Sequence, residues 1–151
     1  MKIRQSFEQA ICILLLIGTR EGPMKSYELS TILGVSDSYL KKIMRQLVVS
    51  ELVVSKASKL GGFVLNKEMK DITLLDIFDA IEGKEKFIET THLVEKVFDV
   101  SLRVKETESI IVDYLNNAEI QYRSKLKEIN LLQIFESAHQ NPEHHKTYKS
   151  L

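Results

Sequence analysis

The positions of glycine and proline divide this 151-residue chain into two unlike parts. Five of the six glycines and one of the two prolines lie before residue 65, and neither residue type occurs between Gly83 and Pro142. Glycine and proline are the residues that most often end helices and form turns. The sequence therefore predicts short elements joined by turns at 1–83, followed by a helical unit at 84–138 and a polar, flexible tail at 139–151.

Two helices open the first unit. The apolar spacing over 7–19 predicts a buried helix, and Ser26 is expected to cap a second helix over 26–33. Gly34 would end that helix and begin a tight turn, because glycine readily adopts the left-handed conformation found at helix ends. Three apolar side chains of the second helix should face the core: Leu29, Ile32 and Leu33.

A third helix should follow the turn, with Ser36 as its N-cap. Its residues at i, i+3, i+4 and i+7 are apolar and predict a core-facing side: Leu40, Ile43, Met44 and Leu47. The opposite side is polar and basic: Asp37, Ser38, Lys41, Lys42 and Arg45. Two helices separated by a glycine turn are typical of a helix-turn-helix, whose second helix enters the major groove of DNA.

A two-stranded wing is predicted after the third helix. Residues 51–55 and 63–65 are rich in β-branched and aromatic side chains, and the loop 56–62 between them contains lysine and glycine. A fourth helix over 72–81 should be capped by Thr73 and stopped by Gly83. Its acidic residues are expected to be solvated on the outward face: Asp76, Asp79 and Glu82.

The second unit contains a long stretch without helix breakers, from about residue 92 to about 126. A helix of that length cannot bury its apolar side against a small winged unit, so a second copy of the chain is the expected partner. The predicted dimer interface is a roughly heptad stripe: Val97, Val104, Ile111, Leu115, Ala118 and Tyr122. A short apolar helix over 130–135 should precede the tail.

Charge is distributed unevenly, although the formal net charge is zero. Residues 1–70 carry 11 Lys and Arg against 6 Asp and Glu, and residues 71–151 carry 10 against 15, which gives +5 and −5. A basic first part suits an anionic partner. Neither a membrane span nor a signal peptide is evident, so the protein is expected to be cytoplasmic.

The recognition chemistry would lie on the third helix and on the wing. Ser38 can donate or accept a hydrogen bond, Lys41 and Lys42 can reach guanine or a phosphate, and the Tyr39 hydroxyl can bond a phosphate or the ring can simply pack. The sequence therefore predicts these DNA-contacting residues: Ser36, Ser38, Tyr39, Lys41, Lys42, Arg45, Lys56, Lys59, Gly61 and Gly62.

Several linked motifs resemble the Rrf2 family of bacterial transcription regulators. They are SDSYLKKIMRQL at 36–47, ELVVS at 51–55, GGFVL at 61–65 and ITLLDIFDAIEG at 72–83. The resemblance covers residues 1–83 closely, and the long helix agrees with the dimerisation helix of that family. It implies a mainly α fold, a winged helix-turn-helix with a long C-terminal dimerisation helix. It also implies a homodimeric repressor of a palindromic operator, with the third helix at the bases and the glycine wing in the minor groove.

Two departures from the family pattern limit what the resemblance implies. Ala57 and Ser58 stand where the family's wing commonly has arginine and glycine, so Lys56 or Lys59 would have to contact the minor groove. Several members hold an iron–sulfur cluster on three cysteines, but the corresponding stretch at about 89–105 has none. We therefore expect no cofactor, and Cys12, within an apolar run, should be a buried hydrophobic residue.

Other functions are less well supported by the sequence. His139, Glu143, His144 and His145 lie in a polar tail without an apolar frame, so no metal site is expected. No arrangement of catalytic residues and no phosphate-binding loop stands out, so the chain is not expected to be an enzyme. The alternative is a winged-helix protein–protein interaction module that does not read DNA. A small-molecule or protein effector, bound between the fourth and the dimer helix, would add to DNA binding.

Overall fold

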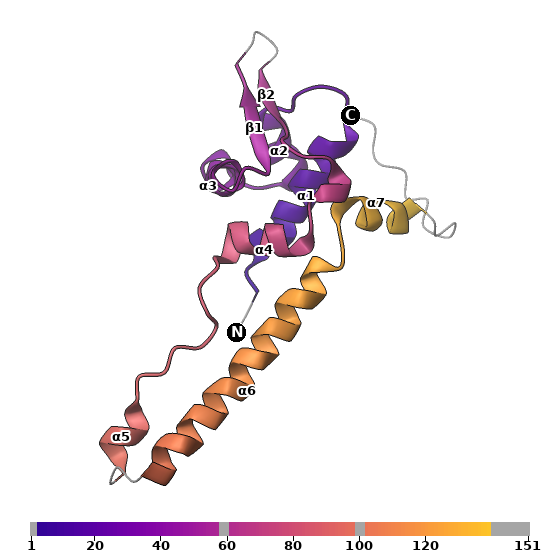
Figure 1. The fold of residues 1–151 in the computed structure, drawn as a ribbon. Helices are drawn as coiled ribbons and strands as arrows, with labels where there is room; N and C mark the ends of the chain where they lie inside the picture. Colours follow the sequence, from indigo (N-terminus) through magenta and orange to yellow (C-terminus); the bar gives the residue numbers. More distant parts are fainter. Residues whose placement is uncertain (1–2, 58–60, 99–101, 140–151) are drawn as a thin grey trace.

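The computed structural model describes residues 3–57, 61–98 and 102–139. A winged helix-turn-helix unit lies at one end, and a long helix, α6, runs away from it (Figure 1). The elements in chain order are α1 (Gln5–Thr19), α2 (Ser26–Leu33), α3 (Asp37–Val49), β1 (Val53–Lys56), β2 (Gly62–Leu65), the 3₁₀ helix η1 (Met69–Asp71), α4 (Leu74–Glu82), α5 (Leu93–Val97), α6 (Leu102–Lys127) and α7 (Leu131–His139).

The hydrophobic core lies in the winged unit, around α1. The four apolar residues predicted for the inner side of the third helix are all buried, which confirms that prediction. On α1 the buried positions recur with the helical period, at Ala10, Ile13, Leu14 and Ile17. Cys12 falls between them on the outer side and is exposed, so its predicted burial was wrong.

The start of α2 differs from the sequence prediction. Lys25, not Ser26, is the N-cap, and its backbone N–H donates to the Glu28 carboxylate over 2.8 Å. That hydrogen bond lowers the pKa of Glu28, and the Arg20 guanidinium, 3.1 Å from Glu28, adds to the effect. Leu29 is buried as expected, but Ile32 is exposed, because the inner side of so short a helix is completed by Ser30.

The wing is an antiparallel pair in which Val53 lies opposite Leu65 and Lys56 lies opposite Gly62. The first strand begins two residues later than predicted, because Glu51 has φ +58° and turns the chain out of α3. Phe63 also exchanges two backbone hydrogen bonds with Met24, of 2.8 and 3.0 Å, which tie the wing to the segment before α2.

The acidic residues of α4 are not simply solvated, as the sequence suggested. Thr73 caps the helix, and Asp76 completes a capping box by accepting from the Thr73 backbone N–H over 2.8 Å. Asp79 pairs with Arg123 and Glu82 pairs with Arg4, each over 2.6 Å. Gly83 ends the helix, as predicted, and adopts φ +98°.

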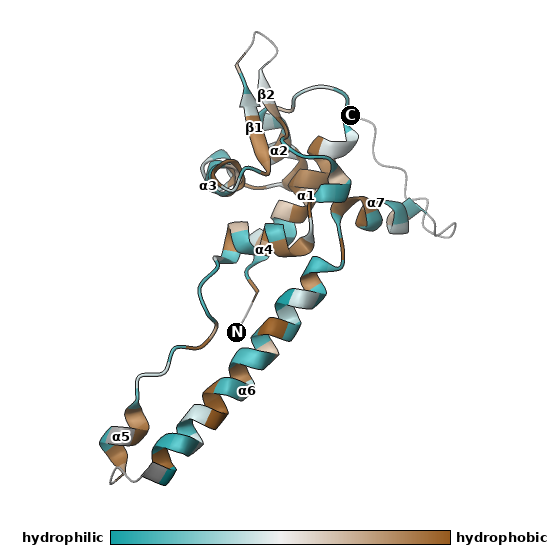
Figure 2. Cartoon of the chain, viewed as in Figure 1, coloured by the Kyte–Doolittle hydropathy of each residue, from teal (hydrophilic) through white to brown (hydrophobic). Residues whose placement is uncertain are grey.

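The long helix is shorter than the sequence suggested. A five-residue helix, α5, ends at Val97, the backbone of the next residue, Phe98, is extended, and α6 begins only at Leu102. Val97, predicted on the long helix, therefore lies on α5. The 26 residues of α6 span about 39 Å. Apolar residues recur along its length beyond the winged unit (Figure 2). None of the helices in the described ranges is long and apolar enough to cross a membrane.

Arg123 connects α6 to the winged unit. Its guanidinium bonds Asp79 of α4 over 2.6 Å, Glu119 over 2.8 Å and the backbone carbonyl of Glu85 over 3.2 Å. It also lies over the rings of Phe78 and Phe87, 5.6 and 5.3 Å from their centroids. The Phe87 backbone N–H, which donates to Glu119, and then Arg123 lower the pKa of the Glu119 carboxyl.

The last helix, α7, returns to the winged unit. The Leu131 N–H donates to the Ile72 carbonyl and the Leu74 N–H donates to the Ile129 carbonyl, over 2.8 and 2.9 Å. Leu131 is fully buried in the core. The sequence grouped this helix with the extended unit and ended it near residue 135, whereas α7 packs against α1 and η1 and ends at His139. The remainder of the predicted tail lies outside the described residues.

We expect the Arg123→Ala variant to lose about 2–4 kcal/mol of unfolding free energy, because two partly buried carboxylates would lose their cation. Urea denaturation of the full-length protein measures this loss. Lys125→Ala is the matched control, since Lys125 forms only an exposed pair with Glu128 and should change stability by less than about 1 kcal/mol. Equal losses in both variants would contradict the role assigned to Arg123.

Candidate nucleic-acid interface

The orientation of α3 is determined at its first turn. Gly34 adopts φ +66° and turns the chain between α2 and α3. The Ser36 hydroxyl then accepts a hydrogen bond from the Tyr39 backbone N–H over 3.3 Å, as the sequence predicted, and lies 3.3 Å from the Ser38 hydroxyl. Because the opposite side of α3 is buried, this capped turn presents its polar side outward.

The polar side of α3 is open to solvent. All the DNA-contacting residues predicted on or before this helix are exposed: Ser36, Ser38, Tyr39, Lys41, Lys42 and Arg45. No other part of the described chain packs over them, so they are available to a partner that approaches along the helix. Tyr39 is the least exposed of the group, and its side chain turns toward α1.

Lys41 has an acidic neighbour that the sequence prediction did not take into account. Its ammonium lies 2.6 Å from the Asp37 carboxylate, one helical turn earlier. Both side chains are largely exposed, at 66% and 48%, and surface pairs of this kind contribute only about 0–1 kcal/mol. A phosphate can therefore replace Asp37 as the partner of Lys41 at little cost.

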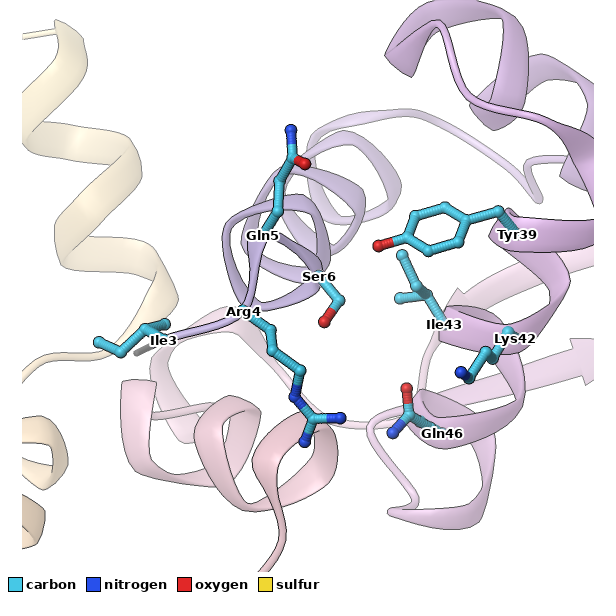
Figure 3. Close-up of a pocket in the computed structure, with 8 residues that line it drawn as sticks. All are labelled: Ile3, Arg4, Gln5, Ser6, Tyr39, Lys42, Ile43 and Gln46. Carbon is cyan, nitrogen blue, oxygen red and sulfur yellow. The ribbon is translucent and has the colours of Figure 1, made fainter. Parts of the chain in front are cut away.

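A groove of about 510 Å³ separates α3 from the first turn of α1 (Figure 3). Tyr39 and Lys42 reach into it from α3, and Ser6 faces them from α1 (Figure 3). The first backbone N–H groups of a helix have no partner within that helix and favour anions. The groove thus combines a cation, a hydroxyl and a helix N-terminus.

Sequence reasoning did not find the α1 side of this groove. Arg4 lines it but is held by Glu82 over 2.6 Å and by the Ile81 carbonyl over 2.9 Å. Gln46 also lines it, and its side-chain amide donates to the same carbonyl over 3.3 Å. These residues lie up to 78 positions apart in the sequence, and no local pattern indicates that they meet.

The wing carries fewer of the predicted contacts than the helix. Lys56 is exposed at the end of β1, and Lys59 lies outside the described residues. Gly62 belongs to β2, where a Cβ atom would lie 2.6 Å from the Met24 carbonyl oxygen. Glycine at position 62 is therefore required by the packing of the wing, whatever the wing contacts.

Of the residues predicted to form a dimer interface, Val97 is exposed on α5, and the five on α6 fall into two groups. Val104 is half-buried, and Ile111, Leu115 and Ala118 are exposed on one side of α6, together with two residues that the sequence reading omitted, Ile110 and Tyr114. Tyr122 instead packs within its own chain, with its ring 5.6 Å from those of Phe78 and Phe87. We refer to Ile110, Ile111, Tyr114, Leu115 and Ala118 as the α6 face.

The chain is similar to known proteins along most of its length. The family model for Rrf2, described as an iron-dependent transcriptional regulator, matches residues 3–137. YwgB of Bacillus subtilis, a candidate HTH-type transcriptional regulator, is 40% identical over 101 residues, which are 66% of this chain and 65% of YwgB. YffB of Lactococcus lactis, named in the same way, is 34% identical over 143 residues, which are 93% of this chain and 91% of YffB.

Solved structures share the fold. CymR, the global cysteine regulator of B. subtilis, superposes with a TM-score of 0.64 at 22% identity, covering 91% of this chain and 98% of CymR. IscR of T. potens superposes with a TM-score of 0.63 at 25% identity, covering 91% of this chain and 88% of IscR.

Replacing Asp37 with Asn should tighten binding to random duplex DNA. A unit charge about 4 Å from a phosphate costs about 1 kcal/mol in water, so roughly fivefold tighter binding is expected. Fluorescence anisotropy at low salt measures the change, and circular dichroism checks that α3 is retained. Asp113→Asn, the same change at an exposed position of α6, should leave affinity unaltered. Weaker binding by the Asp37 variant would mean that Asp37 itself makes a favourable contact.

Proposed function

Because the chain belongs to the Rrf2 family of transcriptional regulators, we propose that it is a homodimeric repressor that binds a palindromic operator. The observation that carries this proposal is the polar side of α3, exposed from Asp37 to Arg45 beside a two-stranded wing. A helix that buries one side completely and leaves the other free can enter the major groove without rearrangement of the core.

In this proposal α3 reads the bases from its first two turns. Ser38 and Lys41 are the residues nearest the helix start that can hydrogen-bond base edges. Lys42 faces the groove between α3 and α1, where Tyr39 and the first turn of α1 also lie, and this arrangement suits a backbone phosphate. Base reading and phosphate binding would then come from adjacent lysines.

The wing would contact the neighbouring minor groove. Lys56 supplies a cation at the end of β1, and Lys59 supplies another in the loop that follows. Since no arginine occupies the position that the family commonly uses, this contact would add affinity through charge.

Dimerisation would use the α6 face. Its apolar side chains are exposed over about three helical turns, which is costly in water and suits a matching surface. Two copies joined in this way would hold their α3 helices about 34 Å apart, one turn of DNA, as a palindromic site requires.

The matching family is described as iron-dependent, but an iron–sulfur cluster does not fit the residues of this chain. The whole chain contains one cysteine, Cys12 on α1, so three cysteines of one chain cannot hold a cluster. Among the described residues, no group of three His, Cys, Asp or Glu side chains is arranged to bind a metal ion. We therefore propose that this member regulates transcription without an iron–sulfur cluster.

The second candidate function is a protein–protein interaction module built on the same fold. The neutral total charge favours it, because a module that does not bind DNA needs no excess of cations. The two functions differ in retention of random duplex DNA at low salt, which only the regulator should show.

Replacing both Lys41 and Lys42 with alanine should weaken binding to a duplex selected from a random library by the unaltered protein. Each lost phosphate contact removes about 0.9 from the slope of log affinity against log salt, so loss of the Lys42 contact from both chains of a dimer would remove about 1.8. Titrations at several salt concentrations measure the slope.

The matched control is the Lys125→Ala, Lys127→Ala variant. It makes the same change of charge at exposed positions on the last turn of α6. The control should keep the original slope. If the α3 variant also keeps it, Lys42 does not contact a phosphate and the orientation proposed for α3 is incorrect.

Replacing Ile111 and Tyr114 with lysine should separate the dimer into monomers, because both side chains lie at the centre of the α6 face. Analytical ultracentrifugation over a range of concentrations measures the change. The control is Ile120→Lys, at an exposed residue on a different side of α6. A dimer that survives the first variant would exclude the α6 face as the interface.

A further inference from the structure

An apolar groove lies between α1, α2 and α7, away from the candidate nucleic-acid interface. Its volume is about 550 Å³, and ten side chains line it, none of them from α3 or the wing. Cys12, Leu16 and Thr19 contribute from α1, Ile32 from α2, and Phe135 and Ala138 from α7. The groove accounts for two side chains that the sequence placed in the core, Cys12 and Ile32, which instead lie at its surface.

The lining favours an uncharged occupant. Seven of the ten residues are aliphatic or aromatic, and none is Lys, Arg, Asp or Glu. The Thr19 hydroxyl donates to the Leu15 carbonyl over 2.8 Å, and the His139 ring packs against Phe135 at an interplanar angle of 45°, with centroids 4.1 Å apart. A charged molecule would lose hydration here at a cost of several kcal/mol, and among the described lining residues only the His139 ring, which packs against Phe135, could carry a charge.

The size of the groove favours a small molecule over a protein. Pockets for small ligands typically measure about 300–1,000 Å³, and 550 Å³ lies within that range. A stable interface with a protein partner needs about 20–30 residues on each side, which is two to three times the ten described residues that line this groove. The polar composition of residues 140–151, which include Glu143, Lys146 and Lys149, makes that segment a poor match for an apolar surface.

The pKa of the Cys12 thiol agrees with an apolar groove. Although the Cys12 side chain is exposed, its neighbours in the groove partly desolvate the thiol and raise its pKa, and the charge of Glu8 one turn earlier adds to the effect. The thiol is therefore neutral near pH 7 and suits an apolar surrounding. Because it is the only cysteine in the chain, its reactivity can be followed without interference.

We propose that this groove is a binding site for a neutral, apolar small molecule. The occupant would contact α2, the first helix of the helix-turn-helix, and α7, which follows α6 in the chain. The occupant would thereby connect α2, which precedes and orients α3, with α7, which returns from α6 to the winged unit. In a transcription regulator such a site would receive an effector, and this last statement rests on the proposed function.

Binding is tested with Nile red, a neutral apolar dye whose fluorescence rises when it leaves water. The full-length protein should bind it saturably at one site per chain. In the Ala138→Phe variant the added ring would fill the groove, and affinity should fall at least about tenfold, or about 1.4 kcal/mol. Ser137→Phe adds the same ring one residue away, outside the lining, and should bind as the unaltered protein does.

The rate at which N-ethylmaleimide alkylates Cys12 provides the second measurement. Saturating dye should slow alkylation at least about tenfold, because the dye would cover the thiol. Unsaturable dye binding, equal affinity in the two phenylalanine variants, or an unchanged alkylation rate at saturation would each overturn the proposal, since the dye would then occupy another surface such as the α6 face. All measurements are made without DNA, so their failure would leave the proposed function standing.

Discussion

The guanidinium of Arg123 holds the two parts of this protein together. It binds carboxylates of α4 and α6 and a carbonyl of the segment between α4 and α5, and it lies over two aromatic rings of the core. Because α6 meets the winged unit chiefly at α4, this contact determines the direction in which α6 leaves that unit. The position that α3 would take in a dimer depends on the same direction.

The surface that we propose contacts DNA follows from the packing beneath it. Leu40, Ile43, Met44 and Leu47 bury one side of α3, so the opposite side cannot turn inward without opening the core. The glycine turn before α3 and the serine cap at its start fix where the helix begins. In the proposed function, recognition would therefore be carried by a helix whose orientation is already determined by hydrophobic contacts, and little order would need to be gained on binding.

The α6 face and the groove between α1, α2 and α7 are both apolar surfaces outside the core, and their shapes suit different occupants. The α6 face is a stripe along one side of a straight helix, which matches another helix of the same kind. The groove between α1, α2 and α7 is concave and measures about 550 Å³, and ten of the described side chains line it, which matches a small molecule. Shape, more than hydrophobicity, therefore separates a surface for assembly from one for a ligand.

Local sequence signals determined the helix-turn-helix and most of its caps, because the period of apolar residues and the conformations of Gly34 and Gly83 act within a few residues. They also determined which side of α3 is exposed, as the complement of a buried stripe. Only the tertiary structure decided that the acidic residues of α4 have partners and that α7 returns to the core. It also decided that Tyr122 faces inward and that the first turn of α1 lies beside α3. Each of these contacts joins residues distant in the sequence, and their burial depends on packing that no local pattern encodes. The break between α5 and α6 belongs with them, since no glycine or proline marks it.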